Sequence, residues 1–437
     1  MRRFFIETLG CPKNLVDSEV IRGLLEKKGY IFDAEKPSYY ILNTCAFIEP
    51  ALRESFEAIE RLIDLKKKGR IEKLVIAGCL PQRKADFLRK MYPEIDLIVG
   101  SSMIGYISEL IEKRGFYANK RKAFLYSHDT PRNLLTPGHY AYLKIAEGCS
   151  RKCTFCTIPS IKGPVKSRLL ESVLAEARQL IEKGVRELIL IAQDLTMYGI
   201  DLYGKPALRE LLAKLDALPG DFWIRLLYLH PAGVNRRLLQ AIKAMDKVVP
   251  YLDVPVQHVS DKLLRLMGRA GGGKKVRWVV EKIRSGLPGF YLRTEIIVGF
   301  PGESDEEFQE LLRFVEDARF ERIGLFRYWD EPRTPSSRME EKVPEETIEE
   351  RYAIAFEISN LVMERAQERL VGKTLKAIAD ESGALGTFLR TPYDAPEIDM
   401  GIRIGEKLKP GHFYKVEVTK REGLNLEGKV KRGGNNR

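Results

Sequence analysis

The stretch Cys149-Ser-Arg-Lys-Cys153-Thr-Phe155-Cys156 carries the most specific signal in this sequence. Its three thiols, spaced Cys-x3-Cys-x2-Cys, follow an apolar run at 140–146 that is typical of a buried strand. Structural zinc sites prefer paired Cys-x2-Cys units that supply four ligands, which makes a zinc knuckle the weaker interpretation. Three thiolates suit a 4Fe–4S cluster in which one iron stays open to a further ligand.

The remaining cysteines, Cys11, Cys45 and Cys79, bring the total to six in a chain of 437 residues. An even number could mean disulfides in a secreted protein, but a chain of this length does not need them. Glu7 ends the first apolar run too early for a signal peptide, and no apolar run approaches the ~20 residues that cross a bilayer. We therefore expect a cytoplasmic protein without membrane contact, whose thiols serve a metal or catalysis.

Residues 1–125 alternate between strand-like and helix-like segments, as a parallel sheet flanked by helices requires. Cys11, Cys45 and Cys79 each come just after an apolar run, at intervals of 34 residues. Loops that follow the carboxyl ends of parallel strands gather at one edge of the sheet, so these three thiols can meet there. Free cysteine is often an inert core residue, but the equivalent loop positions favour a shared site.

Residues 135–365 contain six further strand-like runs separated by helical patterns. The runs lie at 140–146, 186–192, 223–228, 252–256, 292–298 and 323–328. Ser304 and Glu307 have the spacing of a capping box, which predicts the start of a helix there. Six βα units predict an incomplete barrel, with its working residues on the loops at the carboxyl ends of the strands.

Residues 368–437 follow a long amphipathic stretch at 345–369 and contain short alternating runs rich in Val, Thr, Gly and Lys. This pattern is typical of a small antiparallel β-barrel. The predicted fold class is therefore α/β. It comprises an open parallel α/β domain at 1–125, an incomplete (βα) barrel at 135–365 and a small antiparallel β-barrel at 368–437.

The cysteine loop resembles that of the radical S-adenosylmethionine (SAM) superfamily, and Phe155 between the last two cysteines matches the family pattern. In that family the open iron binds the amino acid end of the cofactor, and reduction of the sulfonium releases a deoxyadenosyl radical. The resemblance implies that Phe155 contacts the cofactor. It implies further cofactor contacts after the second strand and in the stretch 296–303, namely Gln193, Asp194, Ile296, Val298 and Gly299.

The whole chain resembles the methylthiotransferases, which have a three-cysteine α/β domain before the barrel and a small β-barrel, the TRAM module, after it. The resemblance implies two 4Fe–4S clusters. Cys149, Cys153 and Cys156 would hold the catalytic one, and an auxiliary one would be held by Cys11, Cys45 and Cys79. It also implies two uses of SAM, one to methylate a sulfur on the auxiliary cluster and one to generate the radical.

Within this family, the stretch Leu-Gly-Cys-Pro-Lys-Asn-Leu-Val-Asp-Ser-Glu at 9–19 resembles the ribosomal-protein branch. That branch modifies the β-carbon of an aspartate in the decoding-centre protein of the small subunit. The stretches 144–149 and 394–399 resemble the same branch, whereas Met267, Trp329 and Met400 depart from its pattern. The alternative is the branch that modifies isopentenyladenosine in tRNA, which usually has Cys-Gln-Met-Asn in the first stretch. A non-catalytic iron–sulfur carrier or RNA-binding protein, which would never yield deoxyadenosine, is a further alternative.

The formal net charge of +12 is partly concentrated in residues 405–437, which carry nine Lys and Arg against four Glu. This basic stretch is a candidate contact with ribosomal RNA. Part of the terminal domain is instead acidic, which predicts a face suited to a basic ribosomal protein. Its members are Asp380, Glu381, Asp394, Glu397 and Asp399.

Two further partners are implied by the resemblance: a reduced electron donor such as flavodoxin or ferredoxin, and a sulfur donor. The lone histidines His230 and His258 are interpreted as hydrogen-bonded structural residues without a catalytic role. The sequence leaves the oligomeric state open.

Overall fold

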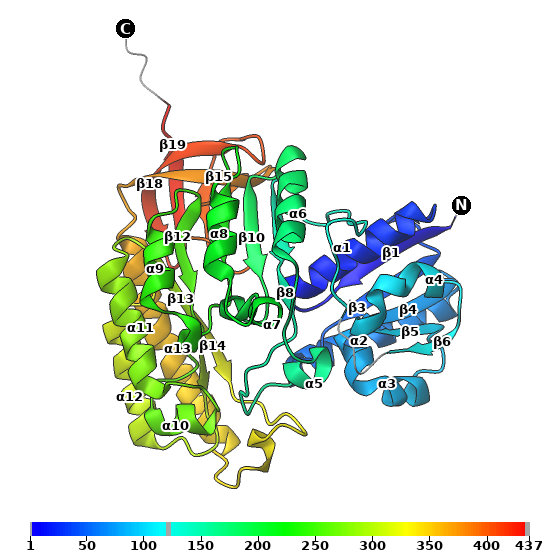
Figure 1. Ribbon diagram of the computed structural model, residues 1–437, viewed down its shortest axis with the longest axis horizontal. Coiled ribbons are helices and arrows are strands. Elements are labelled where there is room, and N and C mark those ends of the chain that lie inside the picture. Colours follow the sequence, from blue (N-terminus) through cyan, green and yellow to red (C-terminus); the bar gives the residue numbers. More distant parts are fainter. Residues whose placement is uncertain (1, 119–123, 433–437) are drawn as a thin grey trace.

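A computed structural model describes residues 2–118 and 124–432, which form three units (Figure 1). Arg437, counted above in the basic stretch, lies outside the described residues. In the described part of the chain, no helix is long and apolar enough to cross a membrane.

The first unit is a six-stranded parallel sheet in the order β2-β1-β3-β4-β5-β6, flanked by helices. Its elements are β1 (Arg3–Thr8), α1 (Pro12–Lys27), β2 (Ile31–Phe32), β3 (Tyr39–Thr44), α2 (Glu49–Lys67), β4 (Lys73–Gly78), α3 (Cys79–Met91), β5 (Leu97–Gly100), η1 (Ser101–Tyr106), α4 (Ile107–Leu110) and β6 (Gly115–Tyr117). The predicted alternation of strands and helices is confirmed.

The second unit is a parallel sheet in the order β14-β13-β12-β11-β10-β7, with helices on its outer face. Its strands are β7 (Tyr140–Lys144), β10 (Glu187–Ile191), β11 (Trp223–Leu226), β12 (Val248–Asp253), β13 (Tyr291–Val298) and β14 (Arg322–Arg327), and the two-residue strands β8 (Ala146–Glu147) and β9 (Lys166–Ser167) pair beside it. Its longer helices are α5 (Ile158–Lys162), α6 (Leu170–Glu182), α8 (Leu208–Asp216), α9 (Arg236–Lys243), α10 (Asp261–Leu266), α11 (Gly272–Gly286), α12 (Asp305–Ala318) and α13 (Glu345–Glu368), with short turns at α7 (Ile200–Tyr203), η2 (Leu195–Met197), η3 (Pro231–Gly233) and η4 (Ser336–Arg338).

Alternate residues of these strands bury opposite faces of the sheet. Leu188 and Leu190 of β10 pack against the helices, whereas Ile189 and Ile191 face the hollow side. Burial on both faces explains the continuous apolar run of this strand. The incomplete barrel predicted from six βα units is confirmed.

The fourth strand of the barrel begins earlier than predicted, at Val248 rather than at 252, and it ends at Asp253. Pro250 lies inside β12 and cannot donate a ladder hydrogen bond. The register between β11 and β12 shifts between the pairs Ile224–Val248 and Leu226–Leu252, on either side of this proline. A proline in an apolar run argues against a strand in the sequence, and here the shifted register accommodates it.

The third unit is a closed five-stranded barrel in the order β15-β16-β17-β19-β18. Its strands are β15 (Thr374–Gly383), β16 (Gly386–Arg390), β17 (Ile402–Ile404), β18 (Phe413–Glu422) and β19 (Asn425–Val430). The predicted small barrel is confirmed, although the β17–β19 pair is parallel whereas the other pairs are antiparallel.

The terminal barrel covers the amino ends of the central strands, and this contact corrects the predicted acidic face. Asp394 pairs with Arg322 at 2.6 Å, and Asp399 accepts a hydrogen bond from the Tyr251 hydroxyl at 2.7 Å. Glu397 and Asp380 likewise bond to Tyr140 and His139 of the central unit. Four of the five acidic side chains thus bond within the protein; among the five, Glu381 and Glu397 are exposed, and Glu381 has no such bond to the central unit.

Candidate active site

The three cysteines of the central unit lie in the loop between β8 and α5, at the carboxyl end of the first barrel strand. The loop is anchored at both ends, because the Cys149 amide donates to Gly163 at 3.0 Å and the Thr154 amide donates to Met267 at 3.0 Å. Gly148 has a φ of +78°, and a Cβ there would lie 2.2 Å from the Pro164 carbonyl oxygen. The chain can therefore enter the loop this way only with glycine.

The thiols of this loop are free and partly buried. Burial raises the pKa of Cys156 to about 12 and also raises the pKa of Cys149. Arg269 brings Nη1 to 3.7 Å from the Cys153 sulfur, so one cation is already aimed at the set. Because a thiol must lose its proton to ligate a metal, cluster binding here releases protons.

The three cysteines of the first unit follow three neighbouring strands. Cys11 precedes α1 as its N-cap, Cys45 follows β3, and Cys79 is the first residue of α3 directly after β4. The loops of Cys11 and Cys45 approach closely, since a Cβ on Gly10 would lie 2.6 Å from the Cys45 Cβ. The charge of Cys11, added to the larger effect of burial, raises the pKa of Cys45 to about 11.

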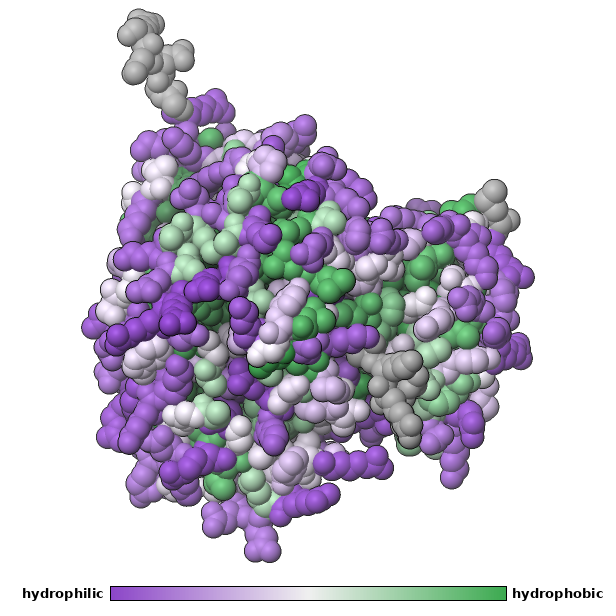
Figure 2. Space-filling model, in the orientation of Figure 1, coloured by the Kyte–Doolittle hydropathy of each residue, from purple (hydrophilic) through white to green (hydrophobic). Residues whose placement is uncertain are grey.

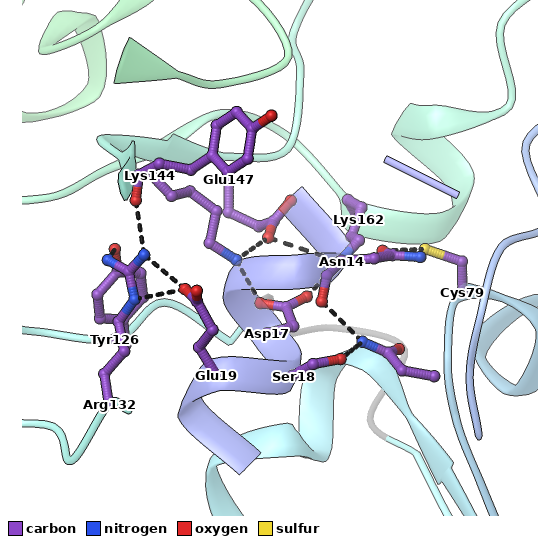
Figure 3. A network of polar contacts seen from close by, with 12 residues as sticks. Asn14, Asp17, Ser18, Glu19, Cys79, Tyr126, Arg132, Lys144, Glu147 and Lys162 are labelled. Carbon is purple, nitrogen blue, oxygen red and sulfur yellow. Dashed lines mark hydrogen bonds and ion pairs between the residues drawn. The ribbon is translucent and has the colours of Figure 1, made fainter. Parts of the chain in front are cut away.

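Asn14, in the first turn of α1, joins the loops of these three cysteines. Its side-chain amide donates to the carbonyl oxygens of Leu9 and Thr44 at 2.9 and 3.1 Å. Its Oδ1 lies 3.6 Å from the Cys79 sulfur. One buried amide thus contacts the segments before Cys11 and Cys45 and the third thiol itself (Figure 3).

The two cysteine sets fit clusters better than single ions. In residues 2–118 and 124–432, no three Cys, His, Asp or Glu side chains are close enough to hold one metal ion. A 4Fe–4S cluster is larger than one ion and is held by thiolates at separate corners. One set offers three free thiols from a single loop and the other offers three from neighbouring loops, and the thiols in a set lie near enough to affect one another's pKa.

Gln193 and Asp194 follow β10 at the same edge as the cysteine loop. Gln193 donates to Glu147 at 2.6 Å, while its own Oε1 is buried without a partner among the described residues. Asp194 accepts from Arg151 at 2.8 Å and from the Thr196 amide at 2.8 Å. Asp194 therefore holds the cysteine loop, whereas Gln193 keeps an acceptor available for a ligand.

The other predicted cofactor contacts are spread along β13 and its following turn. The rings of Phe155 and Phe300 meet edge to face at 6.4 Å. Ile296 and Val298 pack within the buried core, so they offer a ligand backbone atoms. The Gly299 amide donates to the Glu303 carboxylate at 3.1 Å, and a Cβ on Gly299 would lie 2.4 Å from Ile348. The Phe155 ring connects the cysteine loop to the residues that follow β13.

A group of charged residues lies where the end of β12 pairs with β13, and it was not predicted as a site from the sequence. Arg293 pairs with Asp253 at 2.9 Å and with Glu295 at 3.0 Å. Burial raises the pKa of Asp253 to about 6 although Arg293 opposes this effect. Tyr228 and Gln257, which follow β11 and β12, have φ values of 67° and 71°. Such backbone conformations in residues other than glycine are typical of functional sites.

Lys13 lies between this group and the first cysteine set. Its ammonium is 3.8 Å from the centre of the Tyr228 ring. Burial alone would lower the pKa of Lys13, but the nearby charges of Tyr228, Cys11, Glu147 and Glu295 together raise it. The side chain is therefore a cation placed beside Cys11 and the carboxyl end of β11.

The two histidines are hydrogen-bonded within the protein, as expected from the sequence. His230 and His258 are buried, and each Nδ1 accepts a backbone N–H two residues further along the chain. Burial lowers the pKa of His230 to about 2. Both rings stabilise the turns that follow strands of the barrel.

Four buried charges join α1 to the cysteine loop of the barrel (Figure 3). Lys144 contacts Asp17 and, at 2.9 Å, Glu147. Lys162 lies 3.3 Å from Asp17 and 3.5 Å from Glu147. Two cations and two carboxylates thus balance one another between the two units.

Comparison with known proteins agrees with this geometry. Residues 143–315 match the radical SAM superfamily, residues 3–100 match Uncharacterized protein family UPF0004, and residues 371–430 match the TRAM domain. The chain is 40% identical to the ribosomal protein uS12 methylthiotransferase RimO of Clostridioides difficile, over 98% of this chain and 99% of that one. It is 43% identical to the protein of the same name from Thermosipho africanus, with the same coverage.

The chain belongs to the uS12 methylthiotransferase family.

This membership makes it a radical SAM transferase and confirms the resemblance noted above. Among solved structures, the radical SAM methyltransferase TsrM of Kitasatospora setae has a TM-score of 0.54 at 16% identity, covering 77% of each chain. That likeness shows a shared fold. Membership of the uS12 methylthiotransferase family implies SAM and a 4Fe–4S cluster, and the donor sets described above fit such groups.

Proposed function

We propose that this protein transfers a methylthio group to the β-carbon of an aspartate in the small-subunit ribosomal protein uS12. The relatives named for that reaction cover nearly the whole chain. The observation that carries the proposal is the pair of three-thiol sets, one on each parallel sheet, at edges that α1 brings together. An enzyme that joins a radical to a sulfur needs two such sites within reach of one substrate.

We assign a 4Fe–4S cluster to each set, the catalytic one to Cys149, Cys153 and Cys156 and the auxiliary one to Cys11, Cys45 and Cys79. Bound at these sites, SAM and the clusters would supply the hydrogen-abstracting radical and the methylthio group.

The chain's own residues hold the two sites in place. Arg269 directs its charge at Cys153, and Asp194 holds the loop through Arg151. Gln193 keeps an acceptor free where the family places the methionine end of SAM. Phe155, Ile296, Val298 and Gly299 would line the rest of the cofactor site. Asn14 fixes the spacing of the auxiliary thiols.

Three partners complete the proposal: a reduced electron donor such as flavodoxin or ferredoxin, a sulfur donor, and ribosomal RNA at the basic C-terminal stretch. Part of that stretch is already paired within the protein, since Arg421 contacts Glu364 and Glu368 and Arg432 contacts Glu406. Lys407, Lys409 and Lys415 are exposed or partly exposed and have no ion pair in the described residues. The domain limits 1–125, 135–365 and 368–437 belong to the same proposal.

An anaerobic assay tests the function. The enzyme is reconstituted with iron and sulfide, reduced, and given SAM with either uS12 or an isopentenylated tRNA. Mass spectrometry should find a methylthio gain on one aspartate peptide of uS12. A gain on the tRNA alone would keep the chemistry and overturn the substrate, and deoxyadenosine without either product would overturn the assignment to methylthio transfer.

A further inference from the structure

Lys13 is a cation without a carboxylate partner in the candidate active site. Its ammonium lies over the Tyr228 ring, and no ion pair or hydrogen bond joins it to an acceptor within residues 2–118 and 124–432. Lys13, Cys11 and Tyr228 are all partly exposed. An ammonium on a ring face keeps its N–H groups available on the side away from the ring.

The acidic groups nearest to Lys13 are already occupied. Glu147 is buried and accepts from Lys144 at 2.9 Å and from Gln193 at 2.6 Å. Glu295 is paired with Arg293 at 3.0 Å. Because these carboxylates already accept hydrogen bonds or ion pairs from other donors, the Lys13 ammonium can bind an acidic group from another molecule.

We propose that the Lys13 ammonium binds the side-chain carboxylate of the substrate and so selects an acidic residue for modification. This inference rests on the proposed function. In aspartate the carboxylate carbon is bonded directly to the β-carbon. A carboxylate held on Lys13, two residues from Cys11, therefore places the β-carbon next to the auxiliary thiols. The ring of Tyr228, a residue with a left-handed backbone conformation, contacts the ammonium on one side.

The test combines enzyme variants with substrate variants. Lys13→Met removes the charge and keeps the length of the side chain, Lys13→Arg keeps the charge, and Lys27→Met makes the same change at an exposed site on the same helix. Each reconstituted enzyme is titrated with uS12 carrying either Asp or Asn at the modified position. Binding is followed by fluorescence anisotropy, methylthio product gives KM and kcat, and iron content is measured for every variant.

The ion pair predicts a loss that depends on the substrate. Lys13→Met should weaken binding of the Asp substrate roughly 10- to 100-fold, while leaving the already weaker binding of the Asn substrate unchanged. Lys13→Arg should restore most of the binding, and Lys27→Met should resemble the wild type. Equal losses with both substrates, or no loss, would overturn the role of Lys13. If Lys13→Met loses iron, the preference for the Asp over the Asn substrate is compared between Lys13→Arg and the wild type. Absence of this preference in the wild type, or its loss in Lys13→Arg, would then overturn the role of Lys13. Wild-type enzyme that leaves uS12 unmodified would overturn the proposed function and this inference with it.

Discussion

Asn14 shows how one uncharged side chain can organise a cluster site. It is almost fully buried in the first turn of α1 and contacts the segments of all three auxiliary cysteines. A buried amide that loses its partners leaves unsatisfied carbonyl groups, which costs free energy. Its place within the cysteine loops makes it a positioning residue for the auxiliary site.

Replacing Asn14 with Ala should therefore lower the iron retained at the auxiliary set and leave the catalytic set intact. We expect iron per chain to fall toward half of the wild-type value, while cleavage of SAM continues. Iron analysis and deoxyadenosine formation check this outcome. Asn235→Ala, which removes the N-cap of α9 in the barrel, is the matched control. Equal iron in the two variants would contradict the role of Asn14.

The two thiol sets should fail in different ways. Cys153→Ala should abolish formation of deoxyadenosine, because it removes a ligand from the set that would bind SAM. Cys45→Ala should spare deoxyadenosine and stop sulfur transfer. Chromatography of the nucleoside and mass spectrometry of uS12 separate these effects, and methylthio product from Cys45→Ala would sink the auxiliary assignment.

At this scale the sequence predicted thiols better than it predicted their neighbours. The spacing of Cys149, Cys153 and Cys156 is a local pattern and is visible without a structure. The roles of Lys13 and Asn14 depend on contacts between loops that are distant in the sequence and that three strands bring together. The left-handed backbone conformation of Gln257 accompanies its bridge to Ile296 of the neighbouring strand, and no local pattern in the sequence indicates it.

Among the secondary structure elements, α12 has the start signal that the sequence predicted. Ser304 accepts from the Glu307 amide, and the Glu307 side chain accepts from the Ser304 amide at 2.8 Å, which completes a capping box. Ser304→Ala should lower the free energy of unfolding by about 1 kcal/mol. Urea denaturation checks the change, with Ser285→Ala, an exposed serine late in α11, as the control. Equal midpoints for the two variants would show that the cap is not stabilising.

The contact surfaces of helix α1 cannot be predicted from its hydrophobic pattern. Ile21 and Leu25 pack on the first sheet, whereas Val16 and Val20 pack against the hollow side of the barrel. Asp17, Ser18 and Glu19 between them are buried as well. A helix buried on several faces lacks the single apolar stripe that reveals its environment. The helix itself was predictable, but its second contact surface was not.

For the whole molecule, the predicted order of the three units is confirmed, but their contacts came only from the structure. Arg225 and Arg390 are fully buried where the terminal barrel meets the central strands, and both contact Glu187. Four of the carboxylates that were predicted to form a surface for a partner instead bond to the central unit. The face in Figure 2 is mainly hydrophilic around a hydrophobic middle. Leu169, next to α6, and Leu202 and Tyr203 of α7 are exposed.

This interface predicts a loss of stability in acid. Burial alone would raise the pKa of Asp380, but Arg390 and His139 outweigh it and hold the pKa below its usual value. The ionised group therefore stabilises the fold at pH values above its unfolded pKa, and this contribution is lost as the pH falls through the folded pKa. Between about pH 5 and about pH 3, the Tm of the wild type should fall more steeply than the Tm of Asp380→Asn. Parallel profiles would mean that Asp380 adds no pH dependence.

The shared charges between α1 and the barrel limit how these units can be exchanged between relatives. Asp17 and Glu19 belong to the first unit, but their cations Arg132, Lys144 and Lys162 come from beyond residue 124. A chimaera cut between the units would bury one sign of charge without the other unless the donor and recipient match at all five positions. Recombination across this junction therefore has to preserve the sign of each of these buried charges as well as the fold of each unit.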